Sequence, residues 1–200
     1  MREFPKYKEP SIEVIEDLEI LRTITKPFAW DIETNSIKPH GKDCKIVSCA
    51  IADTSDHAYV FMMPQKRSQR LPLVELLGNE DIGKVAHSMK FEHTWAEIIL
   101  GIIVKGWLWD TMLMAHVMDN RSGITGLKFL TYTMLGEIDY SSAIEPYLKG
   151  VEEKNANALN RVLELVSTES GKQQLLKYNA LDAINTYRIW KLQELEMLPF

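Results

Sequence analysis

The chain has 200 residues, of which 46% are hydrophobic and 26% are charged, and its formal net charge is −5. This composition suits one globular domain with a substantial core, and no apolar run is long enough to span a membrane. The N-terminus has no apolar signal-peptide region. The spacing of Cys44 and Cys49 disfavours a disulfide between them, and neither cysteine has other zinc ligands nearby, so we expect a reducing cytoplasm. The negative charge disfavours a protein that holds nucleic acid by a basic surface.

In chain order, residues 1–27 are expected to form a leader and then a helix over 11–24, which Pro27 ends. Residues 28–200 are expected to form the single globular unit. The patterns predict strands at 28–34, 45–52 and 57–63, a short helix at 74–77, a strand at 84–87, a helix through Glu92 that stops at Gly101, and a strand near 106–109. Helices are expected at 123–136, at 155–176 with a break near 169–171, and then to about residue 190.

Two carboxylates interrupt the apolar run over residues 28–34. Side chains on a strand alternate between its faces, so Asp31 and Glu33 should point the same way, and Phe28, Trp30 and Ile32 the other way. Buried like charges are costly unless something compensates them, and Mg²⁺ or Mn²⁺ would do so through carboxylate oxygen. A wet strand end with both acids solvated is the alternative interpretation.

The last helical segment carries Tyr178 and Asp182 four residues apart, hence on one helix face. Its apolar stripe runs through Leu176, Ala180, Ala183, Tyr187 and Trp190, and Asp182 lies beside that stripe. A third segment, residues 84–92, reads as a strand that enters a helix with Glu92 in its first turns. There the helix dipole alone would favour a carboxylate.

Together these segments resemble the DEDD superfamily of 3′→5′ exonucleases in its tyrosine-containing subclass, and most closely the proofreading domain of family A (Pol I-like) DNA polymerases, phage ones included. The family motif D-x-E matches Asp31 and Glu33, N-x-K-[FY]-D matches residues 88–92, and Y-x-x-x-D matches Tyr178 and Asp182. The likeness extends over about residues 28–190, with the motifs in family order. It implies an α/β, ribonuclease H-like fold with a mixed five-stranded sheet, the second strand antiparallel to its neighbours, and helices on both faces.

The resemblance also implies the site. Two divalent ions, Mg²⁺ or Mn²⁺, would be held by Asp31, Glu33, Glu92 and Asp182, with Asp31 bridging them, and Tyr178 would position the attacking water. A phenol is a poor base at neutral pH, so Tyr178 is assigned orientation only. The reaction would release nucleoside 5′-monophosphates from single-stranded or frayed DNA 3′ ends.

The second motif departs from the family pattern at two positions, because Ser88 replaces the usual Asn and Glu92 the usual Asp. Asp110 competes for the fourth acidic position, but we interpret it as the N-cap of the helix that follows. Ser88, Met89 and Phe91 are candidates for contact with nucleic acid, although Met89 and Phe91 would also suit the core.

Two other functions stay open. A ribonuclease D-like 3′→5′ exoribonuclease has the same acids and tyrosine, and a degenerate, non-catalytic domain that only binds nucleic acid would explain Ser88 and Glu92. The chain ends after its last helix, where a family A polymerase would continue. Two interpretations stay open: a stand-alone exonuclease, and a domain of a longer chain whose partner is a polymerase domain in cis or in trans. The resemblance implies a bacterial or phage-infected host cytoplasm as the location.

Overall fold

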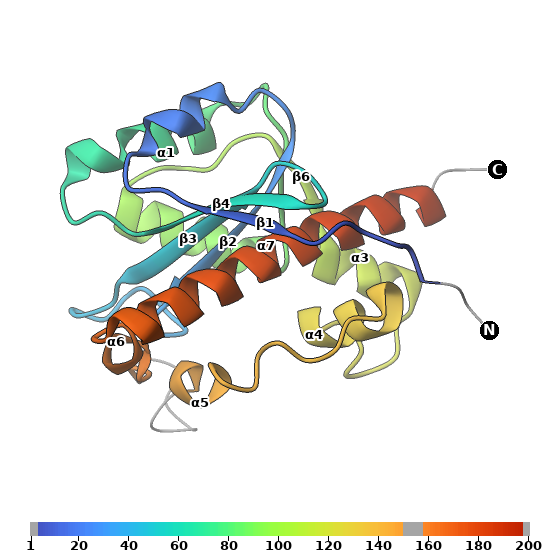
Figure 1. Ribbon diagram of the computed structural model, residues 1–200. Helices are drawn as coiled ribbons and strands as arrows, with labels where there is room; N and C mark the ends of the chain where they lie inside the picture. Colours follow the sequence, from blue (N-terminus) through green and yellow to red (C-terminus); the bar gives the residue numbers. More distant parts are fainter. Residues whose placement is uncertain (1–3, 150–157, 198–200) are drawn as a thin grey trace.

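A six-stranded mixed sheet organises the computed structural model, which describes residues 4–149 and 158–197 (Figure 1). The strand order is β1-β4-β3-β2-β5-β6. β3 is antiparallel to both its neighbours, as predicted, and the β1–β4, β2–β5 and β5–β6 pairs are parallel. The strands are β1 Ser11–Val14, β2 Phe28–Thr34, β3 Ile46–Ala52, β4 His57–Met62, β5 Lys84–Ala86 and β6 Trp107–Asp110.

In the described part of the chain, helices lie between the strands and after the last one, and the longest of them is the 29-residue α7. Four short helices have 3-10 or π geometry: η1 Leu18–Thr23, η2 Arg67–Arg70, η3 Ala96–Leu100 and η4 Thr131–Leu135. The α-helices are α1 Leu71–Gly78, α2 Met89–Trp95, α3 Thr111–Met118, α4 Leu127–Leu130, α5 Glu145–Leu148, α6 Val162–Leu165 and α7 Glu169–Met197.

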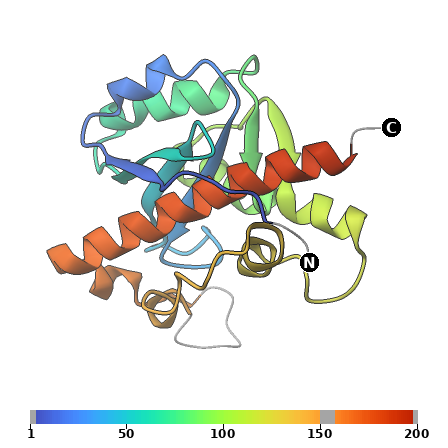
Figure 2. The same ribbon diagram turned by 45° about the vertical axis from the view of Figure 1, so that its right-hand side comes forward.

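Helices cover both faces of the sheet, as predicted. α7 crosses one face, and η1, α1 and α2 lie on the other (Figures 1 and 2). The face beneath α7 carries small side chains, including Ala29 of β2 and Ala50 of β3, which pack against Ala180 and Ala183 of the helix. The opposite face carries large side chains: Phe28, Trp30, Ile32, Ile51 and Phe61. The small residues let the α7 backbone approach the sheet closely, so polar side chains of β2 and α7 can meet.

The predicted helix over 11–24 is wrong in its first half, and the predicted count of five strands is wrong for the same reason. Ser11–Val14 forms β1, which pairs with the edge of β4, and only Leu18–Thr23 is helical. The amide of Ser11 donates to the carbonyl of Asp56 at 2.8 Å. The partner strand lies more than 40 residues away in sequence, so the local apolar pattern could not reveal the pairing.

One other boundary differs from the prediction, and one agrees with it. The helix expected over 155–176 lies partly outside the described residues. Within them, the short helix Val162–Leu165 ends before residue 169, so the break precedes Glu169–Met197 and does not fall at 169–171. The predicted stop at Gly101 is confirmed, because Gly101 adopts the left-handed conformation with φ of 72° that ends helices. None of the helices in the described ranges is long and apolar enough to cross a bilayer.

Candidate active site

Strand β2 presents Asp31 and Glu33 on the face that α7 covers. The alternation places Phe28, Trp30 and Ile32 in the core on the opposite face, which confirms the predicted orientation. β5 pairs only with Phe28 and Ala29. The two acids therefore follow the point where β5 leaves the sheet, so the edge of β2 next to them is open to side chains from helices.

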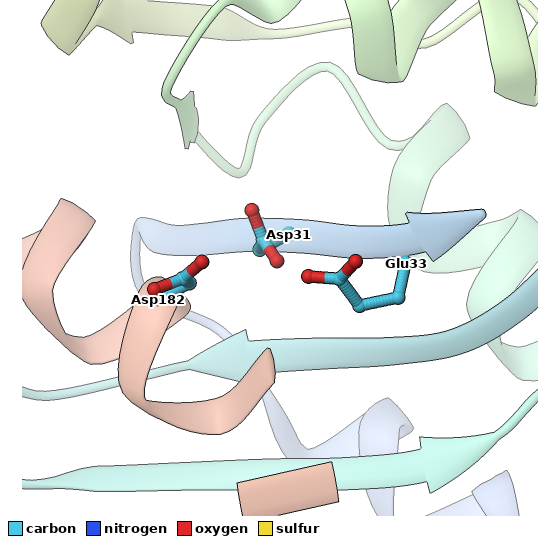
Figure 3. Close-up of side chains that lie close together, drawn as sticks. All are labelled: Asp31, Glu33 and Asp182. Atoms are coloured by element: carbon cyan, nitrogen blue, oxygen red, sulfur yellow. The ribbon is translucent and has the colours of Figure 1, made fainter. Parts of the chain in front are cut away.

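Helix α7 brings Asp182 to these two acids (Figure 3). Asp31, Glu33 and Asp182 each place a carboxylate oxygen within 4.8 Å of the others. At that distance two unit charges repel by about 3.5 kcal/mol for an effective dielectric constant near 20. Three of the four predicted metal ligands therefore converge, and their arrangement demands a compensating positive charge.

A buried amide orients Asp31. Asn179, which has no exposed surface, donates from Nδ2 to Oδ2 of Asp31 at 2.5 Å, and its own Oδ1 accepts from Oγ of Ser48 at 2.8 Å. Sequence reasoning assigned neither residue to the site. Asn179 could have been found, because it lies three residues before Asp182 on α7, and Ser48 is the register partner of Glu33 across β2 and β3.

The acids share a strained electrostatic environment. Burial raises the pKa of Asp31 well above its ordinary value, and the nearby Asp182 raises it further. Burial likewise raises the pKa of Glu33, followed by the charges of Asp31 and Asp182. Desolvation disfavours the charged form of a carboxyl group, and like charges add to that effect. Ionisation of Asp31 and Glu33 therefore lowers the stability of the folded protein.

Glu92 enters the same region from α2. It is only 2% exposed, and burial followed by the charge of Asp31 raises its pKa well above the ordinary value. Its Oε2 atom has no hydrogen-bond partner among the residues that the structure describes. Glu92 does not belong to the group whose oxygens lie within 4.8 Å, but its carboxyl group senses Asp31 and Glu33 electrostatically. A buried carboxyl oxygen without a partner suits a ligand to a cation.

Ser88 and Asp110 shape the turn that delivers Glu92. Ser88 adopts the left-handed conformation, with φ of 75° and ψ of 54°, which asparagine tolerates better than most residues. The Asn usual at this position therefore has a backbone explanation. Asp110 accepts from the amides of Ser88 and Met89 at 3.1 and 2.8 Å, and from those of Met112 and Leu113 at 2.9 and 3.1 Å. The predicted N-cap is confirmed, and Asp110 also ties the turn before α2 to α3.

Replacing Asp110 with alanine is expected to lower the free energy of unfolding by roughly 2 kcal/mol, because a helix cap is lost and buried amides lose their acceptor. Asp110→Asn keeps one carbonyl oxygen as an acceptor, so its free energy of unfolding should fall by about half as much. Urea unfolding of the three proteins measures the difference. Equal stability of Asp110→Ala and the wild-type protein would contradict the capping role.

Tyr178 lies one helical turn from Asp182 and contacts a second tyrosine, Tyr140, and a lysine, Lys128. Its ring centroid is 6.0 Å from that of Tyr140, and Nζ of Lys128 lies 4.3 Å from the Tyr178 centroid and 4.0 Å from the Tyr140 centroid. Nζ of Lys128 and the hydroxyl of Tyr140 both donate to Oδ1 of Asp182. Burial, and then the charge of Asp182, raise the pKa of Tyr178 above its ordinary value near 10, so its hydroxyl keeps its proton at neutral pH.

Lys128 and Tyr140 are site residues that sequence reasoning missed. The motifs contain no basic residue placed to pair with the acids, yet Lys128, from outside the motifs, forms an ion pair with Asp182. Lys128 is 54 residues from Asp182 in sequence and Tyr140 is 42 residues away. No local pattern connects them with Asp182, because the packing of α4 and of the segment that follows it against α7 brings them together.

One cavity reaches the acids at Glu33, and a second cavity adjoins it at Ile37 and Phe91. The first, of about 200 Å³, is lined by Glu33, Ile37, Phe91 and Leu148 among others. The second, of about 330 Å³, shares Ile37 and Phe91 and adds Ser88 and Lys90. Two of the predicted nucleic-acid contacts therefore line these cavities. Phe91 lines both and also packs against the core, and Ser88 lines the second. Met89 contributes its amide to Asp110.

The donor set fits divalent cations. Carboxylate oxygens are the ligands that Mg²⁺ and Mn²⁺ prefer, and Asp31, Glu33 and Asp182 offer one each within a space that a single ion can bridge. Oε2 of Glu92, which has no hydrogen-bond partner in the described part of the chain, adds a fourth buried donor from α2, close enough for the charge of Asp31 to raise its pKa.

Comparison with known proteins agrees with this geometry. A family model described as 3′-5′ exonuclease matches residues 9–196, so the chain belongs to the 3′-5′ exonuclease domain family of the DNA polymerase A type, as the three motifs indicated. Over 140 residues it is 28% identical to DNA polymerase I of Chloroflexus aurantiacus, an alignment that covers 62% of this chain and 14% of the polymerase.

Solved structures share the fold at low sequence identity. NrnC of Brucella melitensis bound to pGG has a TM-score of 0.67 and 17% identity, with 94% of this chain and 81% of NrnC covered. The same protein with bound Mg²⁺ has a TM-score of 0.64 at 17% identity, with 92% and 78% covered. RNase D of Escherichia coli, an exoribonuclease involved in structured RNA processing, has a TM-score of 0.60 and 15% identity, with 94% and 45% covered. These likenesses confirm the predicted ribonuclease H-like fold.

Proposed function

We propose that this protein is an active, tyrosine-type 3′→5′ exonuclease that hydrolyses the terminal phosphodiester of single-stranded or frayed DNA and releases nucleoside 5′-monophosphates. The observation that carries the proposal is the convergence of Asp31, Glu33 and Asp182 from β2 and α7, with their oxygens within 4.8 Å of one another. Membership of the 3′-5′ exonuclease family supplies the reaction class.

Asp31, Glu33, Asp182 and Glu92 would hold two divalent ions, Mg²⁺ or Mn²⁺. When bound, such ions neutralise the phosphate and clamp the attacking and leaving oxygens. Asn179 holds the carboxylate of Asp31 in one orientation, which preorganises the site for its ligand. Tyr178 keeps its proton, so its hydroxyl is suited to orient a water and not to deprotonate it.

The cavity beside Glu33 and the one that adjoins it suit the end of a strand. Phe91 and Ile37 line both cavities, so a base in the first could stack on Phe91 while the strand continues past Ser88 and Lys90. We assign Phe91 and Ser88, with Met89 beside them, to this contact surface. No base edge would be read there, because contacts to the sugar-phosphate backbone and base stacking carry little sequence information.

DNA is the proposed substrate because the Lys90-Phe91 motif context resembles polymerases, and because DNA polymerase I is a relative. An RNA substrate is the second candidate, and the observation that favours it is the fold likeness to NrnC bound to pGG and to RNase D. Incubation with Mg²⁺ and matched 5′-labelled DNA and RNA oligomers separates the two. Stepwise shortening from the 3′ end of DNA in excess over RNA supports the proposal, whereas the reverse preference favours an exoribonuclease.

The same assay addresses the degenerate, non-catalytic alternative, which Ser88 and Glu92 motivate. We propose that neither departure prevents catalysis. The left-handed backbone that the family asparagine favours is adopted by Ser88, and Glu92 keeps a buried carboxyl group toward Asp31. No cleavage of DNA or RNA with either Mg²⁺ or Mn²⁺, by folded protein, would contradict the proposal.

We further propose that the 3′ end reaches this site from a polymerase domain, in cis or in trans, in a bacterial or phage-infected cytoplasm, where it serves proofreading. The matched part of the Chloroflexus relative is 14% of a polymerase, and the net charge of −5 suits a domain that receives its strand from a neighbour.

Replacing Tyr178 with phenylalanine is expected to lower the cleavage rate by roughly 10- to 1000-fold with little change in substrate affinity, because one positioning contact to the water is lost while the ring remains. Single-turnover rates and KM for wild-type and Tyr178→Phe proteins measure this. Tyr147→Phe is a matched control, because Tyr147 is a half-buried tyrosine near α6 that the mechanism does not use. A wild-type rate in Tyr178→Phe would remove this residue from the mechanism.

A further inference from the structure

Lys128 is a cation placed inside the acidic site by a segment that carries none of the motifs. Its Nζ pairs with Oδ1 of Asp182 and donates to the hydroxyl of Tyr140 at 2.9 Å. The same ammonium lies over the rings of Tyr140 and Tyr178, at 4.0 and 4.3 Å from their centroids. The two aromatic rings can hold the ammonium of Lys128 in place even without its ion pair with Asp182.

With two divalent ions and a nucleic-acid strand bound, the site would carry an excess of negative charge that Lys128 could balance. Four carboxylates, from Asp31, Glu33, Glu92 and Asp182, are balanced by two divalent ions. The phosphodiester of the strand brings one more negative charge, and the reaction increases it. Among the residues the structure describes, Lys128 is the cation that forms an ion pair with any of these four acids, and its partner is Asp182. If Asp182 held a divalent ion, the ammonium of Lys128 would lose that partner and would be free to pair with another anion.

We propose that Lys128 is a catalytic residue that binds the anionic phosphate at the 3′ end of the strand, beside the metal-binding carboxylates, and is held there by Tyr140 and Tyr178. This inference rests on the proposed function. The lysine side chain is 36% exposed while that of Asp182 is 7% exposed, so the ammonium lies at the boundary between the buried acids and solvent, where an incoming strand would meet it.

Arg188, on the same helix as Asp182, is a cation with a purely structural environment and serves as a comparison for Lys128. It is 2% exposed and is saturated by Glu137, by the carbonyl of Ser55 at 2.6 Å and by that of Lys8 at 3.2 Å. Those partners hold the N-terminal segment against α7 and leave Arg188 buried. Arg188 also lies over an aromatic ring, that of Tyr7, at 4.4 Å. Lys128 differs because its side chain is 36% exposed and because it donates to the side chains of Tyr140 and Asp182, whereas Arg188 donates to two backbone carbonyls.

The test compares Lys128→Met with Lys177→Met, which removes the same charge from an exposed position on α7. The first readout is the affinity for a fluorescent single-stranded oligothymidylate, measured by anisotropy over a series of salt concentrations with Ca²⁺ in place of Mg²⁺ to slow cleavage. Lys128→Met should bind roughly 10- to 100-fold more weakly, and the slope of log K against log salt should become shallower by about 0.7, the value for one lost contact to single-strand phosphate. Lys177→Met should match the wild-type protein.

The second readout is Mn²⁺ affinity without nucleic acid, measured by calorimetry. If Lys128 serves the phosphate, Lys128→Met should bind Mn²⁺ at least as tightly as the wild-type protein, because a competitor for Asp182 has gone. Lys128→Arg should recover part of the oligonucleotide affinity, and Lys128→Gln, a neutral side chain that can still donate to Asp182, should behave as Lys128→Met and serves if the methionine variant does not fold.

Unchanged oligonucleotide affinity and salt slope in Lys128→Met would overturn the inference even when the wild-type enzyme degrades DNA. Weakened Mn²⁺ binding with an unchanged salt slope would overturn it in favour of a role confined to the fold of the acidic site. A wild-type protein that neither binds nor degrades the oligonucleotide would contradict the proposed function itself. The wild-type measurement gives this result before any variant is compared.

Discussion

Asp31→Asn is expected to lose at least 1000-fold of the cleavage rate while it keeps the native fold. Asp31 stands between Glu33 and Asp182 in the carboxylate group and has its own orienting amide, Asn179. Asparagine has the same shape but lacks the charge that holds a divalent ion, so the clamp on the phosphate should be lost. Glu33→Gln and Asp182→Asn should show losses of similar size for the same reason.

Initial rates on a labelled DNA strand with saturating Mg²⁺ measure this effect, and circular dichroism confirms the fold. Asp43→Asn is a matched control, because Asp43 is an exposed aspartate in the loop between β2 and β3. Unchanged turnover in folded Asp31→Asn protein would refute the assignment of the carboxylate group to metal binding.

The metal-free wild-type protein is expected to melt at a lower temperature than the same protein with millimolar Mn²⁺, by about 5–10 °C. A ligand at 100 times its Kd stabilises the folded state by about 2.7 kcal/mol, and 1 kcal/mol shifts the Tm of a protein of this size by about 2–4 °C. The physical reason is the mutual repulsion of Asp31, Glu33 and Asp182, which Lys128 offsets only in part.

Two variants should differ in their melting temperature without metal. Asp31→Asn removes a carboxyl group whose charged form burial and Asp182 disfavour, so its metal-free Tm should rise and most of the Mn²⁺ shift should vanish. Asp182→Asn also removes a charge, but it takes the anionic partner from Lys128, so its metal-free Tm should rise less or fall. Differential scanning fluorimetry with and without Mn²⁺ measures both. A wild-type protein without any metal-dependent shift would show that these acids do not form one metal site.

Acidification should act in the same direction as metal. The pKa values of Asp31, Glu33 and Glu92 are raised in the folded protein, whereas unfolded carboxyl groups titrate near pH 4. The folded state therefore binds protons more tightly, and these groups add stability as the pH falls through the raised values toward about 4. That contribution is lost as the pH rises. In Asp31→Asn the gain on acidification should be smaller than in the wild-type protein.

Short-range patterns in the sequence determined the parts of the site that one element contains. The period of two along β2 placed Asp31 and Glu33 on one face and Trp30 on the other, because extended backbone alternates its side chains wherever it occurs. The spacing of four between Tyr178 and Asp182 placed both on one face of α7, and the position of Asp110 before Met112 identified a cap. These features depend on backbone geometry within a few residues, so the sequence suffices to predict them.

The tertiary structure alone decided which distant groups meet. Ser11–Val14 became a strand because the edge of β4 offered hydrogen bonds that compete with a helix, and those partners lie outside any local window. Lys128 and Tyr140 reached Asp182 through the packing of α4 and the following segment against α7, and Glu92 settled beside the carboxylate group, not within it. Pairing energies of this kind depend on through-space distance and burial, which a linear pattern of residues does not record.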